Sequence, residues 1–121
     1  MKTRTLLIAA SSLELLIGAA LFAVPGLVVS LLFSATLNSG GDAVARVGGF
    51  ALFSLGVACW PIGDGDFTQR SRAIFLFNLL TACFLGYLKF RGYFTSILLL
   101  PACLLHGVLA LLLARPAFAS L

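Results

Sequence analysis

The sequence predicts an all-α protein, a four-helix transmembrane bundle with a short interfacial segment after the first helix. Hydrophobic residues make up 61% of the 121 residues and charged residues 10%, against roughly 45–50% and 25% in soluble domains. The mean hydropathy is +1.13. Four apolar runs are each long enough to cross a bilayer, which takes about 20 residues for a hydrocarbon core of roughly 30 Å. A soluble fold is therefore excluded.

The four runs use up the chain, so residues 1–121 form a single integral membrane domain. The helices are expected at about residues 5–24, 43–60, 67–90 and 95–115. Pro25 should end the first helix, and the apolar stretch after it is too short to span, so we expect it to be interfacial or re-entrant. Asp42 is expected to cap the second helix. Pro101 is expected to kink the fourth helix, because proline removes a backbone donor.

The eight Lys and Arg residues lie at helix ends, so they indicate membrane topology and not a nucleic-acid site. One side of the membrane carries five of them and the other carries three: Lys2, Arg4, Arg70, Arg72 and Arg115 against Arg46, Lys89 and Arg91. The positive-inside rule then places both termini in the cytoplasm. The partner that this composition implies is the lipid bilayer.

Each apolar run contains one strongly polar residue, and these are Glu14, Arg46, Asn78 and His106. Such residues are costly in a bilayer, so we expect them by default to face the bundle interior or water and to mark where function lies. At a rise of about 1.5 Å per residue, Glu14 lies roughly 14 Å from the cytoplasmic face, Asn78 about 9 Å and His106 about 12 Å. We expect these three to share one layer. Arg46, at roughly 24 Å, either reaches the outer headgroups or forms an electropositive gate for an anionic headgroup or substrate.

The three residues of this layer suit ligand binding or proton relay. A carboxyl group and an imidazole can exchange a proton, and the Asn78 amide can orient either group because it both donates and accepts hydrogen bonds. The site could therefore bind a small molecule or a lipid, or relay protons. The alternative is a purely structural hydrogen-bond network that holds the helices in register.

A stripe of mostly small residues on the second helix, which includes Ala45, Gly49 and Gly56, predicts close contact with another helix. If that contact lies in a larger assembly, the protein is a structural or accessory subunit of a membrane complex. Self-association as a homo-oligomer is a further expectation, because so small a bundle offers little volume for a cargo pathway.

Cys59, Cys83 and Cys103 are odd in number, lie in apolar runs and form no C-x-x-C motif, so neither a disulfide framework nor a zinc site is predicted. Cys103 and His106 share a helix face, but a buried thiol and imidazole explain them better than metal ligation. No metal and no cofactor are expected. A membrane-embedded redox enzyme that uses quinone and Cys83 or Cys103 is the last alternative. The sequence leaves an enzymatic role open and favours a non-enzymatic one.

Several short motifs resemble those of small four-helix bacterial membrane proteins of uncharacterised function. They are Leu13-Glu14-Leu15-Leu16-Ile17-Gly18, Ala45-Arg46-Val47-Gly48-Gly49, Ala58-Cys59-Trp60, Asn78, and Pro101-Ala102 followed by His106. The resemblance covers most of the chain. It implies a place in the bacterial inner membrane and singles out the same four polar positions.

A narrower resemblance is to small multidrug resistance transporters, four-helix chains of similar length with a functional glutamate in the first helix. Glu14, followed by Ile17-Gly18 and Leu21, matches that setting. The likeness is confined to the first helix, because the third run lacks the aromatic and glycine pattern of those transporters and their later helices carry no buried histidine. It implies a functional Glu14 and no more.

Overall fold

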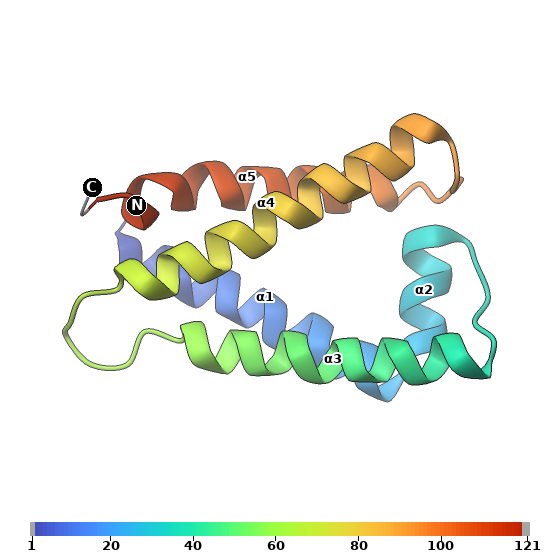
Figure 1. Ribbon diagram of the computed structural model, residues 1–121, viewed down its shortest axis with the longest axis horizontal. Helices are drawn as coiled ribbons and strands as arrows, with labels where there is room; N and C mark the ends of the chain where they lie inside the picture. Colours follow the sequence, from blue (N-terminus) through green and yellow to red (C-terminus); the bar gives the residue numbers. More distant parts are fainter. Residues whose placement is uncertain (1, 120–121) are drawn as a thin grey trace.

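The computed structural model describes residues 2–119, which form five helices and, within that range, no strands. The helices are α1 (Thr3–Ala23), α2 (Pro25–Phe33), α3 (Ser39–Cys59), α4 (Thr68–Arg91) and α5 (Leu99–Ala117) (Figure 1). All except α2 are long and apolar enough to cross a membrane. The predicted all-α transmembrane bundle is confirmed.

The four long helices form two closely packed pairs, α1 with α3 and α4 with α5, while contacts between the pairs are sparser. Figure 1 shows the short α2 lying across one end of the bundle, between the levels of the two pairs. Both termini and the connection between α3 and α4 lie at the opposite end. The exposed Arg4 guanidinium contacts the Asp64 carboxylate at 3.3 Å, which joins the N-terminus to that connection.

The break between α1 and α2 lies where the sequence predicts it. Val24, with φ −137° and ψ 57°, leaves the helical conformation, and Pro25 is the first residue of α2. Proline suits this position because the first turn of a helix does not need its N–H. The segment expected to be interfacial is therefore helical, and it ends at Ser34 in a left-handed conformation with φ 51°.

The start of α3 differs from the prediction. The helix begins at Ser39 and not at Ala43, and its N-cap is Asn38, whose side-chain oxygen accepts a 2.7 Å hydrogen bond from the Gly41 amide. The expectation that Asp42 caps this helix is wrong. Asparagine is as good an N-cap as aspartate, and with Asn38 in place Asp42 lies inside the first turn.

The start of α5 also differs, and the expected kink at Pro101 is wrong for that reason. The helix begins at Leu99 and not at Thr95. Pro101 consequently lies in the first turn, where the backbone amides have no intrahelical acceptor to lose. The helix then continues to Ala117, past the expected end at Arg115.

The predicted small-residue stripe of α3 faces α1 at very close range. A Cβ atom added at Gly49 would lie 2.7 Å from the Gly18 carbonyl oxygen, and one added at Gly56 would lie 2.9 Å from that of Ser11. Such separations leave no room for any side chain. Ala45, at the start of the stripe, is half-buried. The helix contact that the stripe predicts is therefore made within this chain.

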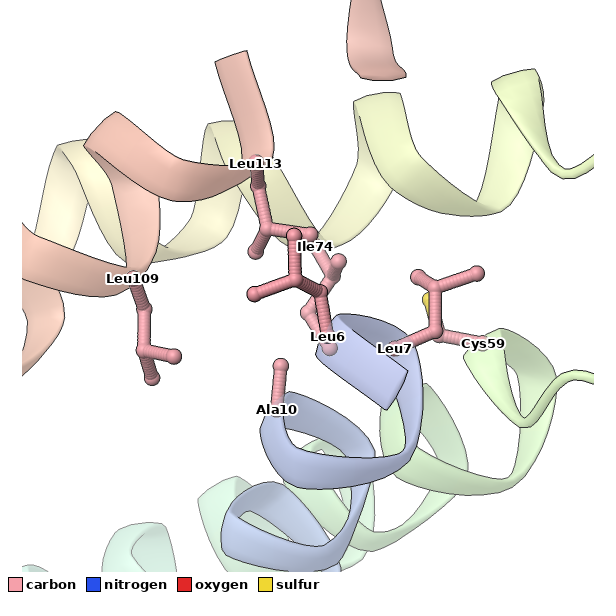
Figure 2. Close-up of a cluster of buried hydrophobic side chains, with 7 residues drawn as sticks. All are labelled: Leu6, Leu7, Ala10, Cys59, Ile74, Leu109 and Leu113. Carbon is pink, nitrogen blue, oxygen red and sulfur yellow. The ribbon is translucent and has the colours of Figure 1, made fainter. Parts of the chain in front are cut away.

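Buried side chains from all four long helices meet near the end that holds the termini. Figure 2 shows this cluster: Leu6, Leu7, Ala10, Cys59, Ile74, Leu109 and Leu113. A second cluster, at the end where α2 lies, contains Leu85, Leu88 and Leu99 with Phe33 and Phe94 packed against it. Large apolar side chains also cover the outside, where Leu111 is 78% and Leu16 is 70% exposed. An exposed surface of this kind fits a lipid environment.

Candidate functional site

Three polar side chains are buried between the two helix pairs, midway between the two hydrophobic clusters. Glu14 on α1 and Asn78 on α4 have no exposed surface, and His106 on α5 is 6% exposed. Helical spacing places each on an inward face. On α1, for example, Ala10, Glu14 and Gly18 are all buried. The structure thus brings to one region three of the four polar residues that the sequence singled out.

The Asn78 side chain forms two hydrogen bonds that fix its orientation. Its Nδ2 atom donates to the Ile74 carbonyl oxygen at 2.8 Å, one turn earlier on α4. A carbonyl oxygen only accepts, so the amide nitrogen must lie on that side. The Oδ1 atom then faces Nδ1 of His106 at 2.7 Å and links α4 to α5.

This orientation also assigns the tautomer of His106. Because Oδ1 of Asn78 can only accept, Nδ1 of His106 must carry the proton. In the neutral ring, Nε2 then keeps a lone pair and acts as an acceptor. The ring of Phe77 meets the imidazole edge-on, with centroids 6.0 Å apart and an interplanar angle of 81°, which further restricts the imidazole plane.

Glu14 is the unusual member of the site. Both of its carboxyl oxygens are fully buried and have no hydrogen-bond partner. The Asn78 side chain approaches the carboxyl group, but without the geometry of a hydrogen bond. A buried polar group left unpaired costs about 1–3 kcal/mol, and more when it is charged. A native protein that keeps such a group generally has a reason to do so.

Glu14 and His106 line the same cavity, which has a volume of about 220 Å³ and lies where the two helix pairs and α2 meet. All five helices contribute to its wall. The polar lining residues are Glu14, Thr81 and His106, and the others are apolar: Ile17, Leu21, Val28, Val29, Leu32, Phe33, Leu52, Phe77, Leu85, Ala102 and Leu105. The cavity therefore combines an extensive apolar wall with a small polar region.

Arg46, the fourth candidate residue, lies apart from this cavity. Its Nε atom is 2.8 Å from a carboxylate oxygen of Asp42, and its Nη1 atom donates at 2.6 Å to the carbonyl oxygen of Phe22. That carbonyl belongs to the last turn of α1, where a cation complements the helix dipole. The structure therefore gives Arg46 a role in joining α3 to the end of α1.

The cysteines occupy three different environments. Cys59 is buried in the hydrophobic cluster of Figure 2, Cys83 is exposed, and Cys103 is half-buried with its Sγ 3.3 Å from the Ala82 carbonyl oxygen. All three are free thiols. Within residues 2–119, no three His, Cys, Asp or Glu side chains come together as they would to hold a metal ion.

Some buried residues near or in the site were not predicted from the sequence. Ser71, which does not line the cavity, is fully buried, and its hydroxyl has no hydrogen-bond partner within residues 2–119. It lies two turns before Asn78 on the same helix face, a spacing that could have revealed it. Phe77 and the cavity-lining residues of α2 carry no comparable signal. The α2 residues reach the cavity only because α2 folds back over the bundle.

A larger hollow of about 560 Å³ lies between the outer faces of α4 and α5, but no side chain with nitrogen or oxygen lines it. Glu14, Thr81 and His106 line the inner cavity and not this hollow. Comparisons of the chain with known protein families, curated proteins and solved structures find no match. Any functional conclusion must therefore come from the geometry of the site itself.

Proposed function

We propose that this protein binds one small amphipathic ligand in the cavity between its helix pairs, with Glu14 and His106 at the polar end. The observation that carries the proposal is the carboxyl group of Glu14, which is fully buried and unpaired among the described residues, on a residue that lines a mostly apolar cavity. A ligand that pairs with this group would offset its desolvation, which packing alone leaves uncompensated. Apolar cavities with a few converging polar groups are the usual form of small-molecule sites.

The proposed setting is the bacterial inner membrane, with both termini in the cytoplasm. Both termini and the α3–α4 connection lie at one end of the bundle, which is the end that carries the larger share of Lys and Arg in the sequence. The positive-inside rule assigns such an end to the cytoplasm. In this orientation α2 lies toward the outer face.

Two observations favour ligand binding over the alternative functions. A proton relay needs a continuous hydrogen-bonded path to one membrane face. Among residues 2–119, the Asn78–His106 hydrogen bond continues to the Ile74 carbonyl, and the buried Ser71 hydroxyl further along α4 forms no hydrogen bond that extends it. An accessory subunit would use the glycine stripe of α3 to dock a larger complex, whereas α1 covers Gly49 and Gly56 of that stripe. The accessory role, moreover, does not explain the unpaired Glu14.

Photolabelling in lipid nanodiscs tests the proposal. The probe is n-hexanol bearing a diazirine on its alkyl chain, and the labelled residues are mapped by mass spectrometry. We expect saturable labelling of cavity-lining residues such as Leu105, with competition by unlabelled n-hexanol. Labelling that rises linearly with probe concentration and is not reduced by competitor would refute a ligand site.

Two variants separate the cavity from the lipid-facing surface. Ala102→Phe places a ring in the cavity and should abolish the saturable labelling, whereas Ala73→Phe, at an exposed position of α4, should leave it unchanged. Glu14→Gln changes the polar end without altering the volume and should weaken labelling. Circular dichroism and gel filtration confirm that each variant is folded. Equal labelling of Ala102→Phe and the wild type would contradict the proposal.

A further inference from the structure

We infer that the ligand of this cavity carries a hydrogen-bond-donating head group, a hydroxyl or an amine, on a short apolar body, and that the site rejects anionic head groups. The inference deepens the proposed function and rests on it. It follows from counting which polar atoms of the cavity donate and which accept.

The Asn78 amide has a fixed orientation. The Ile74 carbonyl holds its NH₂ group, so this donor is directed back along α4 and is already in use. Only Oδ1 remains on the side of α5, where it accepts the proton on Nδ1 of His106. The second N–H of this group is not used by Ile74, but Asn78 does not line the cavity and so does not present that donor to the ligand.

His106 lines the cavity. Its single proton in the neutral form lies on Nδ1 and is used by Asn78, so the atom left to meet a ligand is Nε2, an acceptor. A ligand group that itself only accepts would face this lone pair without a proton between them. A hydroxyl or an amine would supply that proton.

The two carboxyl oxygens of Glu14 have no hydrogen-bond partner within residues 2–119. When ionised, both oxygens only accept, and when protonated, one of them still does. The Thr81 hydroxyl is the other polar group of the wall and can act in either sense. In both states of Glu14, at least one of its oxygens therefore remains an acceptor, together with Nε2 of His106.

The cavity wall contains no Lys or Arg that would attract an anion. Arg46, which might have supplied such a charge, is bound to Asp42 and to the Phe22 carbonyl. A carboxylate or phosphate head would thus place its own acceptors against those of Glu14 and His106. A hydroxyl would donate to one of them, and an ammonium group would donate to both.

Head-group competition tests the inference. In nanodiscs, the diazirine probe competes with n-hexanol, n-hexylamine, n-hexanoate and n-hexane, which share one chain length. We expect n-hexanol and n-hexylamine to compete at least about tenfold more strongly than n-hexanoate and n-hexane, the ratio for loss of one good hydrogen bond to a buried acceptor. Glu14→Gln, which adds a donor at the polar end, should reduce this preference. A stronger effect of n-hexylamine than of n-hexanol would identify the amine as the better head group within the proposed class.

Nitrogen NMR of His106 provides a readout that a purely structural role would not change. We expect the free protein to show a protonated Nδ1 and a bare Nε2, and saturating n-hexanol to shift the Nε2 resonance as it becomes hydrogen-bonded. n-Hexane should leave this resonance in place. Protonation of both ring nitrogens in the free protein, or of Nε2 alone, would overturn the inference.

The outcomes distinguish the inference from the function on which it rests. If n-hexanoate competes as well as n-hexanol, and Ala102→Phe still abolishes labelling, the cavity binds ligands but the donor-head requirement is wrong. If no probe gives saturable labelling, the proposed function itself fails. If n-hexane competes as well as n-hexanol, the apolar wall alone decides binding and the inference is also overturned.

Discussion

The two helix pairs of this bundle are held together in different ways. In the α1–α3 pair, backbone lies against backbone: a Cβ at Gly49 would approach the Gly18 carbonyl oxygen to 2.7 Å. In the α4–α5 pair, a Cβ at Gly107 would lie 3.9 Å from the nearest atom, the Cβ of Ala82, which is an ordinary contact. The second pair is instead bridged by the Asn78–His106 hydrogen bond. The protein thus combines a pair fixed by backbone contact with a pair joined by polar side chains, and the cavity lies where they meet.

The largest effect should come from disturbing the backbone contact. Gly49→Ala places a methyl group against the Gly18 carbonyl and the Phe22 amide, both part of the α1 backbone. Backbone cannot yield as a side chain does, so we expect α1 and α3 to separate at a cost of about 1–3 kcal/mol, the usual range for overpacking. Reversible unfolding in mixed micelles measures this loss.

Two further glycines serve as controls for Gly49→Ala. Gly48 is its neighbour in sequence, but a Cβ there would meet only a Leu21 methyl group at 3.7 Å, and Gly107 has comparable space in the other pair. Alanine at either position should be neutral or slightly stabilising, because alanine favours helix more than glycine does. Equal losses for Gly49→Ala and Gly107→Ala would remove the proposed difference between the pairs.

The second-largest effect should be the coupling across α4 and α5. A double-mutant cycle with Asn78→Leu, His106→Leu and both together isolates the hydrogen bond between these side chains. Interhelical polar contacts in membranes average about 0.6 kcal/mol and reach about 1.7 kcal/mol, so we expect a coupling energy in that range. A coupling of zero would mean that apolar packing alone joins α4 to α5.

The sequence predicted the scaffold of this molecule better than its site. Apolar length fixed the four spanning helices, and small residues at helical spacing identified the α3 face that contacts α1. Both are periodic, local signals. The start of α3 was misplaced because Asn38 and Asp42 are both good N-cap residues and the sequence does not show which one caps the helix. The start of α5 was misplaced because a proline such as Pro101 is tolerated in the first turn of a helix but disrupts a later turn, and the sequence does not show which case applies.

The polar layer was predictable as a set of residues but not as a geometry. The cost of polar groups in lipid is enough to turn Glu14, Asn78 and His106 inward. Which of them pair depends on helix rotations and on side-chain rotamers, which one-dimensional spacing does not determine. Arg46 shows the same limit, since its partner, the Phe22 carbonyl, belongs to the backbone and carries no signature in the sequence.

A smaller effect should follow from releasing the end of α1. Arg46→Gln removes the charge that lies on the Phe22 carbonyl at the helix C-terminus, an interaction of about 0.3–1 kcal/mol. Asp42→Asn is the matched control, because it removes the ion pair and leaves the carbonyl contact intact. Thermal unfolding should show a larger loss for Arg46→Gln than for Asp42→Asn. The reverse order would mean that the negative charge of Asp42 in the first turn of α3, and not the link to α1, is the more important interaction.

The smallest effect should lie in the connection that joins the two pairs. Asp66 there accepts hydrogen bonds from the Thr68 amide and hydroxyl, which lower the pKa of its carboxyl group. Because the folded pKa is lowered, this stabilisation is present above the unfolded pKa and is lost as the pH falls through the folded value. Asp66→Asn should therefore be less stable than the wild type at neutral pH, and this difference in stability should shrink in acid.

Thr68→Val, which removes only the hydroxyl donor, should reproduce part of that difference. If the difference in stability between Asp66→Asn and the wild type stays the same in acid, the shape of the turn, and not the charge of Asp66, determines where α4 begins.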